Sequence, residues 1–255
     1  MTPFDVVRSL AATEHLLVAL DFDGTLAPLQ DRPMEARMTS DAAAAVAALV
    51  AVPATTVAFV SGRALPDLRV IAEHDDRSPI LLAGSHGAEH WPTPTGDVPD
   101  AATLALRDDL FARAESVVAG NEGAWIERKR FGFALHTRLA APAAARAAVA
   151  AVDQLMAECA PGWRRRTGHD IVEFSFRDEG KDAAVARLRQ ITGATAVLFA
   201  GDDVTDEDAL RTLGANDLGV RVGPGETAAA MRVADITELA AMLVRLARER
   251  ALLQE

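Results

Sequence analysis

The chain has 255 residues, half of them hydrophobic, and a formal net charge of −11 at pH 7. This length and composition exclude a disordered chain and leave room for one large domain or two smaller ones. The acidic balance argues against nucleic acid and anionic membranes as partners, and no apolar run approaches the ~18 residues that a membrane-spanning helix needs. Because Cys159 is the only cysteine, no intrachain disulfide can form, and we expect a reducing, cytoplasmic setting. We also expect a monomer.

The first hundred residues alternate between segments typical of helices and of strands. A leading helix is expected within residues 1–15, and the apolar run Leu16–Leu20 then predicts a strand buried on both faces. Further strands are expected at 55–60 and 80–83, and helices at 40–52 and about 65–71. This alternation predicts a parallel sheet.

The pattern changes after residue 91. A loop or hairpin is expected at 91–99, helices at 101–118 and 142–159, and pairs of strands within 125–138 and 163–176. Adjacent strand pairs with intervening helices predict an α+β module inserted into the first domain. Between Trp125 and Arg166 there are eight basic and three acidic residues, a balance typical either of an electrostatic clamp for an anion or of a solvated positive face.

The strand–helix pattern resumes at Gly180. Helices are expected from Lys181, from near Asp206 and over 237–253, with strands at 196–200 and 218–222. We therefore predict an α/β fold with a Rossmann-like parallel-sheet core that is discontinuous in sequence, residues 1–100 and 178–255. The smaller α+β domain, residues 101–177, is expected to be inserted into it.

Residues of complementary chemistry follow the predicted strands or begin the adjoining helix. Sheet topology can bring them to one edge of the sheet, and they are Asp21, Asp23, Ser61, Lys181, Asp202 and Asp203. Carboxylate oxygens suit Mg²⁺, whereas a hydroxyl, an ammonium group and loop N–H groups suit phosphate oxygens. Neighbouring carboxylates indicate a divalent-metal site, a nucleophile beside an acid/base, or both. The ordinary alternatives are a solvated Asp-Gly turn, a surface lysine and an acidic helix start.

The combination of motifs resembles the haloacid dehalogenase superfamily of phosphohydrolases. The superfamily motifs are Asp-Phe-Asp-Gly-Thr at 21–25, Ser-Gly-Arg at 61–63, Lys181, and Gly-Asp-Asp-Val-Thr-Asp-Glu at 201–207. More narrowly, the chain is similar to the trehalose-6-phosphate phosphatase family. That similarity rests on Gly-Ser-His-Gly-Ala-Glu at 84–89, Glu-Arg-Lys at 127–129, Ala-Leu-His-Thr-Arg at 134–138 and Val-Glu at 172–173. It covers about residues 16–240 and implies a haloacid dehalogenase-like core with a cap domain.

The resemblance implies a Mg²⁺-dependent phosphatase that converts trehalose 6-phosphate to trehalose through an aspartyl phosphate. Asp21 would attack phosphorus, and Asp23 would protonate the leaving sugar oxygen and then activate water. Ser61 and Lys181 would hold the phosphate. The implied metal-binding residues are Asp21, Asp23 through its backbone carbonyl, and Asp202, with Asp203 and Asp206 holding metal-bound water or supporting the ligands.

The resemblance also implies contacts with the sugar phosphate. In the core they would come from Gly62, Arg63, His86 and Gly87, and in the cap from Glu127, Lys129, His136, Arg138 and Glu173. Three positions depart from the family pattern. Phe176 stands where proline is usual, Asp182 where glycine is usual, and Thr137 where tyrosine is usual. None removes an implied catalytic group, but together they leave the choice of sugar open.

Other functions are compatible with parts of this pattern. One is a phosphatase for another sugar phosphate, such as sucrose phosphate or a glycosyl-glycerate phosphate. A second is a phosphosugar mutase, which would return the phosphoryl group to the sugar instead of releasing it. A third is a non-catalytic sugar-phosphate sensor, which would be free to lose its catalytic groups, yet Asp21, Asp23, Lys181 and Asp202 are all present.

Overall fold

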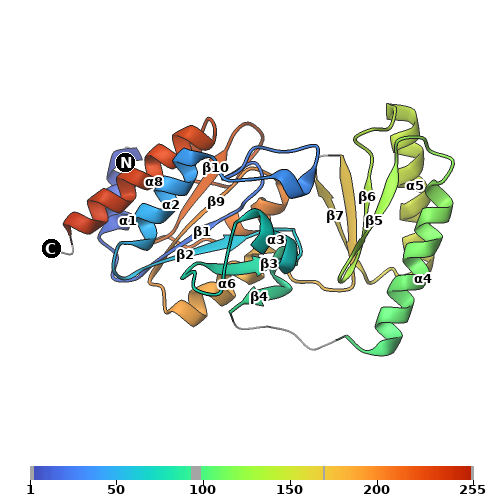
Figure 1. Cartoon of the computed structure of the whole chain (residues 1–255), viewed down its shortest axis with the longest axis horizontal. Helices are drawn as coiled ribbons and strands as arrows, with labels where there is room; N and C mark the ends of the chain where they lie inside the picture. The colour runs from blue at the N-terminus through green and yellow to red at the C-terminus, as the bar shows by residue number, and fades with distance from the viewer. Residues whose placement is uncertain (1–2, 93–98, 169, 254–255) are drawn as a thin grey trace. The chain divides into compact units, whose positions relative to one another are not determined.

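The computed structural model describes residues 3–92, 99–168 and 170–253. The chain divides into two compact units, which we call the core unit and the inserted unit (Figure 1). The core unit is Met1–Thr95 with Glu179–Glu255, and the inserted unit is Gly96–Asp178. The sequence-based division placed its two boundaries at residues 100/101 and 177/178.

A seven-stranded sheet forms the centre of the core unit, in the order β11-β10-β9-β1-β2-β3-β4. The strands are β1 (Leu16–Leu20), β2 (Thr55–Val60), β3 (Leu81–Gly84), β4 (Glu89–Trp91), β9 (Ala196–Gly201), β10 (Leu218–Val222) and β11 (Met231–Val233). All neighbours are parallel except β3 and β4. In β1, Leu16 pairs with Thr55 of β2 and with Ala196 of β9. These three strands therefore end at the same edge of the sheet.

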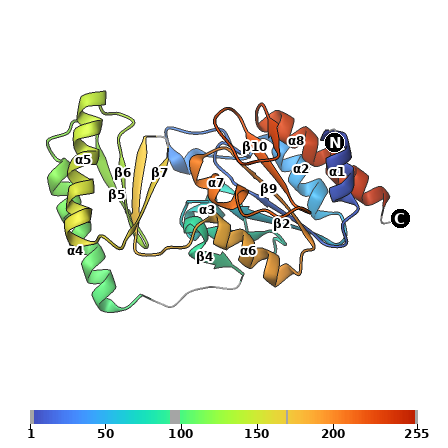
Figure 2. The same ribbon diagram turned by 180° about the vertical axis from the view of Figure 1, so that it is seen from behind.

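Helices cover both faces of this sheet, which explains why its central strands are continuous apolar runs. Figures 1 and 2 show α1, α2 and α8 on one face and α6 on the other. The helices are α1 (Pro3–Ala11), α2 (Ser40–Val50), α3 (Leu65–Ile71), α6 (Lys181–Thr192), α7 (Glu207–Leu210) and α8 (Ile236–Leu252). Successive residues of β1 alternate between the two cores, with Leu16, Val18 and Leu20 in one and Leu17 and Ala19 in the other. Short 3-10 turns are η1 (Pro33–Glu35), η2 (Ser85–Gly87) and η3 (Val204–Asp206).

Two short edge strands of the core unit were not predicted from the sequence. The three residues of β4 pair antiparallel with β3. Only Trp91 of them belongs to the segment 91–99 that was expected to be a loop or hairpin, and residues 93–98 of that segment lie outside the described residues. The three residues of β11 pair with β10. Three residues are too few to show the alternation that identifies a strand. The helix expected near Asp206 is instead the turn η3 followed by the four-residue α7.

The inserted unit is a four-stranded antiparallel sheet with two helices on one face (Figure 1). The strand order is β5-β6-β8-β7, with β5 (Trp125–Lys129), β6 (Gly132–His136), β7 (Arg164–Gly168) and β8 (Ile171–Ser175). The helices are α4 (Ala101–Val118) and α5 (Pro142–Cys159), with the bounds expected from sequence. Asp100 caps α4 by accepting a hydrogen bond from the Thr103 N–H, and Pro142 begins α5.

The two helices of the inserted unit cover one face of its sheet with a hydrophobic core. Ile126, Phe133 and Val172 of the sheet pack there against Leu110 of α4 and Val152 of α5. Side chains alternate along a strand, so the other face carries the intervening residues. In the described part of the chain, no helix combines the length and apolar character required to cross a bilayer.

Candidate active site

The site is built around Asp21, the first residue after the central strand β1. Its N–H donates to the carbonyl of Ala200 in β9, so the backbone is still held by the sheet where the side chain leaves it. The side chain is buried, with the whole residue 4% exposed. Burial raises the pKa of Asp21 well above its usual range, Asp206 and Asp202 raise it further, and Lys181 opposes the shift.

Lys181 connects Asp21 with a second buried carboxylate. It is the first residue of α6, and its Nζ lies 2.6 Å from Oδ1 of Asp21 and 2.6 Å from Oδ1 of Asp206. Lys181 is 3% exposed and Asp206 is fully buried. Burial alone would lower the pKa of Lys181, but Asp206 and Asp21 raise it, so the ammonium is charged. A cation at a helix N-terminus is unfavourable for the helix dipole, and these two carboxylates offset that cost.

Three carboxylates gather around Lys181 at the carboxyl edge of the sheet. Ligand atoms of Asp21, Asp202 and Asp206 all lie within 4.8 Å of one another. With all three carboxylates ionised, the ammonium group of Lys181 would balance one negative charge and leave two uncompensated. Burial, followed by the charge of Asp206, accordingly raises the pKa of Asp202 to about 6. Hard oxygen ligands with an excess charge of two fit Mg²⁺, so the donor set suits the metal that the sequence implied.

Thr25 and Gly24 connect the loop after β1, which carries Asp21, with the loop after β9, which carries Asp202. The Oγ1 of Thr25 lies 3.2 Å from Oδ2 of Asp21 and 3.1 Å from Oδ1 of Asp202. Gly24 has φ +82°, and a Cβ there would lie 2.1 Å from Oδ2 of Asp202. The position therefore requires glycine both for its backbone conformation and for the close approach of the Asp202 carboxylate.

Asp23 does not join the acidic cluster through its side chain. Its two carboxylate oxygens accept hydrogen bonds from Nε and Nη2 of Arg63, both at 2.6 Å, in a bidentate ion pair. Arg63 comes from the loop after β2. The sequence implied that Arg63 contacts the substrate and that Asp23 is the acid/base, and the structure pairs these two residues with each other. Burial would lower the pKa of Arg63, but its hydrogen bonds to Asp23 and the charge of Asp23 raise it.

The loops after β2 and β3 pack against each other beside α6. The buried Ser61 accepts the N–H of Arg63 on its Oγ, and its carbonyl accepts the N–H of His86. A Cβ on Gly62 would lie 2.6 Å from the imidazole of His86, and a Cβ on Gly87 would lie 2.9 Å from Ala184 of α6. Ser61, Gly62, Arg63, His86 and Gly87 thus form one packed assembly with the helix that carries Lys181.

Asp203 also lies outside the three-carboxylate cluster. Its side chain caps the turn η3, and its N–H donates to Oδ2 of Asp206 at 2.9 Å. A Cβ on Gly201 would lie 2.1 Å from the carboxyl carbon of Asp206, so the loop needs glycine there. Asp203 therefore orients Asp206 and shapes the loop instead of adding a fourth carboxylate to the cluster.

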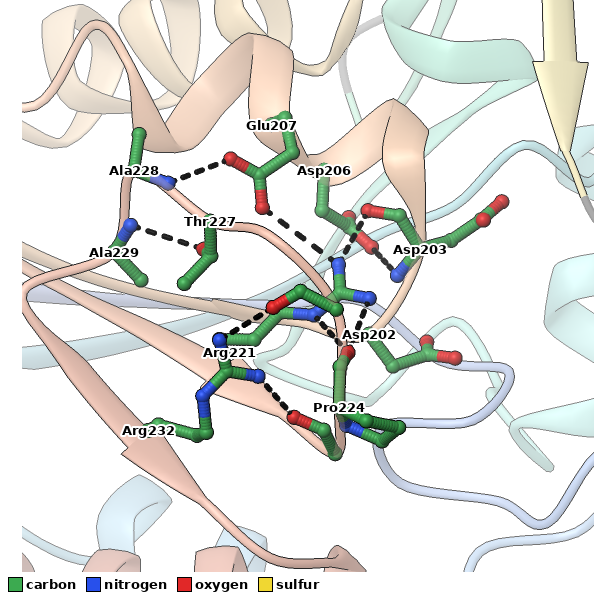
Figure 3. Close-up of polar contacts among 12 residues, drawn as sticks. Asp202, Asp203, Asp206, Glu207, Arg221, Pro224, Thr227, Ala228, Ala229 and Arg232 are labelled. Carbon is green, nitrogen blue, oxygen red and sulfur yellow. Dashed lines mark hydrogen bonds and ion pairs between the residues drawn. The ribbon is translucent and has the colours of Figure 1, made fainter.

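Arg221 of β10 anchors the acidic loop, which we define as residues 202–206, by hydrogen bonding with its backbone (Figure 3). Its Nη1 donates to the carbonyl of Asp203 at 2.9 Å, and its Nε and Nη2 donate to the carbonyl of Pro224 at 3.2 and 3.0 Å. Glu207 lies 3.7 Å from Arg221, and its other oxygen accepts the N–H of Ala228 at 2.8 Å. Both side chains are buried. This Arg221–Glu207 brace links the acidic loop to the segment between β10 and β11.

The inserted unit presents a separate polar cluster on the sheet face opposite its helices. Oε1 of Glu127 lies 2.7 Å from Nζ of Lys129, and Oε2 lies 2.7 Å from Nε2 of His136. Burial would raise the pKa of Glu127, but His136 and Lys129 lower it to about 2. Glu173 of β8 lies on the same face and is half-buried, whereas Arg138 follows β6 and is exposed.

The structure therefore groups some predicted site residues within each unit and adds others. In the core unit it gathers Asp21, Lys181, Asp202 and Asp206, and in the inserted unit Glu127, Lys129 and His136. Sequence reasoning gave no site role to Thr25, Glu207 or Arg221. Arg221 could have been selected from the sequence, because it is a single arginine inside the otherwise apolar strand Leu218–Val222. Thr25 was noted only as the last residue of the Asp-Phe-Asp-Gly-Thr motif, without a role of its own.

The fold gives the class first: a mostly parallel sheet with this acidic edge, interrupted by an α+β unit, is shared with solved structures described as haloacid dehalogenase superfamily enzymes, at TM-scores of 0.59 and 0.60 and identities of 15% and 17%. Residues 19–233 match the model of the trehalose-phosphatase family. The chain belongs to that family, whose members are phosphoric monoester hydrolases. The family, fold class and enzyme class expected from the sequence are thereby confirmed.

Individual relatives agree with this assignment. The chain is 31% identical to the trehalose-6-phosphate phosphatase of Escherichia coli, over 86% of this chain and 82% of that protein. It is 35% identical to a Mycobacterium tuberculosis protein described as an uncharacterized glycosyl hydrolase, but its match covers 88% of this chain and 17% of that much longer protein. The C-terminal domain of the C. albicans trehalose-6-phosphate phosphatase has the same fold, with a TM-score of 0.79 and 19% identity over 97% of both chains.

Proposed function

We propose that this chain is a Mg²⁺-dependent phosphatase that hydrolyses trehalose 6-phosphate to trehalose and phosphate through an aspartyl-phosphate intermediate. The observation that carries the proposal is the contact of Lys181 with both Asp21 and Asp206 at the carboxyl edge of the sheet. That arrangement supplies a fixed oxygen nucleophile, a cation for the phosphate, and excess negative charge to hold a metal.

In the first proposed step, an oxygen of Asp21 forms a bond to phosphorus and the bond from phosphorus to the sugar oxygen breaks. Asp23 gives its proton to that leaving oxygen. The buried Asp21 must be ionised to attack, and burial alone favours its neutral form. Lys181 favours the ionised form and would also offset the repulsion between the carboxylate and the phosphate dianion. Ser61 and the N–H groups of its loop would orient the phosphate oxygens.

Bound Mg²⁺ would neutralise negative charge on the transferring phosphate. The residues that would hold it are Asp21 and Asp202 through their carboxylates and Asp23 through its backbone carbonyl. Asp206 and Asp203 would support that loop. The excess of acidic over basic charge in the cluster, together with the raised pKa of Asp202, supports this assignment.

The ion pair between Asp23 and Arg63 sets a condition on this chemistry. Both oxygens of Asp23 accept hydrogen bonds from Arg63. To protonate the leaving oxygen, Asp23 must first take up a proton on one of these oxygens and exchange that contact with Arg63 for the substrate. The phosphate dianion is an alternative partner for the guanidinium of Arg63, so substrate binding supplies the means of exchange. In the second step, water attacks the aspartyl phosphate, gives its proton to Asp23 and releases Asp21.

The inserted unit would act as the cap that selects the sugar. Glu127, Lys129 and Glu173 lie on one sheet face and carry groups that hydrogen-bond with sugar hydroxyls. Two departures from the family pattern are accounted for within this unit. Phe176 packs edge-on against Phe131 and Trp163, and Thr137 donates its hydroxyl to the carbonyl of Asp170 at 3.2 Å. Their roles are structural, which favours retention of the family's sugar.

The decisive experiment measures phosphate release from trehalose 6-phosphate, sucrose phosphate, a glycosyl-glycerate phosphate and glucose 6-phosphate, with and without Mg²⁺. The proposal expects trehalose 6-phosphate to be turned over best and chelation of Mg²⁺ to stop the reaction. Comparable rates on all four substrates would sink the assignment to trehalose 6-phosphate. Formation of an isomeric sugar phosphate without free phosphate would instead identify a mutase. A cytoplasmic monomer is part of the proposal, and sizing of the purified chain tests the monomer.

A further inference from the structure

The inserted unit carries a half-exposed tryptophan beside its polar cluster. Trp125 begins the edge strand β5 and is 38% exposed. Its cross-strand partner is His136 of β6. The two rings are stacked, with centroids 4.7 Å apart and planes 8° from parallel. One face of the indole is therefore covered by the imidazole, and the exposed surface belongs to the other face and the ring edges.

Strand alternation places Trp125 on the same sheet face as the polar cluster. Ile126, the next residue, packs in the hydrophobic core under the helices, so Trp125, Glu127 and Lys129 point to the opposite face. Along the adjacent strands, Glu127 is opposite Ala134, which is opposite Glu173. Acidic side chains thus flank a position with only a methyl group.

The same register leaves little side-chain bulk in the next row of this face. Lys129 is opposite Gly132, which is opposite Ser175. The row that begins with Trp125 continues through His136 to Ile171. The face therefore combines an aromatic ring at one edge, small residues on β6, and charged groups on either side.

His136 is placed to support the tryptophan more than to contact a ligand. It is 7% exposed, one face of its ring lies against Trp125, and its Nε2 lies 2.7 Å from Oε2 of Glu127. Glu127 is itself held by Lys129. A ring that is hydrogen-bonded at its edge and stacked on its face has one orientation, and it fixes the indole that lies on it.

A pyranose ring has the two kinds of surface that this face offers. Its axial C–H groups form an apolar patch suited to an aromatic plane, and its hydroxyls surround that patch and bind carboxylate and ammonium groups. We propose that Trp125 is a specificity-determining residue that stacks on a pyranose ring of the sugar phosphate, and that His136 is a positioning residue that fixes the indole. This inference rests on the proposed sugar-phosphate phosphatase activity and deepens it.

Kinetics of Trp125→Leu and Trp125→Phe provide the first test, with trehalose 6-phosphate and the acyclic acetyl phosphate as substrates. Trp125→Leu is expected to raise KM for the sugar phosphate by about tenfold with little change in kcat, and to leave acetyl phosphate hydrolysis unchanged. Trp125→Phe keeps an aromatic plane and should restore most of the loss. His136→Gln keeps a hydrogen-bonding group for Glu127 without the stack and should raise the same KM less.

Fluorescence gives a readout that does not depend on turnover. The chain has three tryptophans, and we expect binding of the product trehalose to change the emission of Trp125. The change should vanish in Trp125→Phe and persist in Trp163→Phe, because Trp163 packs edge-on against Phe176. Circular dichroism and thermal melting would show that each variant is folded.

Three outcomes would overturn the inference. They are an unchanged KM in Trp125→Leu, equal losses on both substrates, and a trehalose-induced emission change that survives in Trp125→Phe. Failure of the proposed function is distinguishable, because it appears in the unaltered protein. If that protein prefers another sugar phosphate, the same comparison is made with that sugar, whereas a protein that accepts no sugar phosphate refutes both proposals.

Discussion

Both units pair carboxylates with a lysine, but they do so in opposite electrostatic settings. In the core unit, Lys181 is 3% exposed and lies among three carboxylates, those of Asp21, Asp202 and Asp206. The pKa of Asp202 there rises to about 6. In the inserted unit, the side chain of Glu127 is 41% exposed and has both Lys129 and His136 as partners, and its pKa falls to about 2. The core cluster is therefore short of positive charge and can hold a cation, whereas the inserted cluster is already balanced.

This difference predicts which substitutions affect every substrate and which affect only sugars. A change in the core cluster alters the charge around the reacting phosphate, whatever group is attached to it. Under the proposed function, a change among Glu127, Lys129 and His136 would remove a partner for sugar hydroxyl groups and leave the phosphate chemistry intact.

The largest effect is expected for Asp21→Asn, which removes the proposed nucleophile. Turnover of trehalose 6-phosphate and of p-nitrophenyl phosphate should both fall by roughly 10⁴-fold or more, because no covalent intermediate can form. The measurement is phosphate release under single-turnover conditions, with the fold checked by circular dichroism. Asp31→Asn, at an exposed loop position, is the control and should be fully active. Substantial activity in Asp21→Asn would refute the nucleophile assignment.

A smaller and selective effect is expected for Lys129→Ala. Loss of one charged hydrogen bond of about 1.5–3 kcal/mol should lower kcat/KM for trehalose 6-phosphate by roughly ten- to hundredfold. Hydrolysis of p-nitrophenyl phosphate should be unaffected. Arg128→Ala is the matched control, because Arg128 is the preceding residue of the same strand and pairs with Asp108 of α4. Equal losses on the two substrates would contradict a sugar-selecting role for this face.

Arg221→Lys tests whether the brace behind the acidic loop contributes to metal binding. Lysine keeps the charge but cannot reach the carbonyls of Asp203 and Pro224 together, so Mg²⁺ affinity should fall about tenfold. Isothermal titration with Mg²⁺ measures this directly. Arg189→Lys is the control, because Arg189 forms a comparable bidentate pair with Asp217 away from the cluster. If both variants bind Mg²⁺ as tightly as the unaltered chain, the brace has no role in the metal site.

The smallest effect is a pH-dependent difference in stability in the absence of metal. The pKa of Asp202 is raised from 3.8 to about 6, so its ionised form destabilises the fold above pH 6, and protonation relieves that cost as the pH falls toward 3.8. Asp202→Asn should therefore melt a few degrees higher than the unaltered protein at pH 7.5, and the gap should narrow at pH 5. Melting curves recorded with a chelator at both pH values test this. A gap that does not change with pH would contradict the raised pKa.

The elements that the sequence predicted well are those with strong local signals. The apolar run Leu16–Leu20 ends at an aspartate, and α5 begins at Pro142, so their limits are set by neighbouring residues. The acidic residues and Lys181 could be selected for the same reason, because they directly follow strands or begin a helix. The site residues that were missed depend on contacts between distant segments. Arg221 of β10 donates a hydrogen bond to the carbonyl of Asp203, which follows β9. The proposed role of Trp125 depends on its stacking with His136 of the next strand.

The position of β9 in the core sheet has a consequence for how the chain is made. Residues 196–201 form the strand between β1 and β10, so β1 lacks one neighbour until that late segment has been synthesised. The strands and helices of the inserted unit are contiguous from 101 to 175 and can assemble earlier. On the ribosome the inserted unit is therefore expected to fold before the core. A nascent chain that stalls before residue 196 leaves the backbone hydrogen-bonding groups of β1 open to other chains.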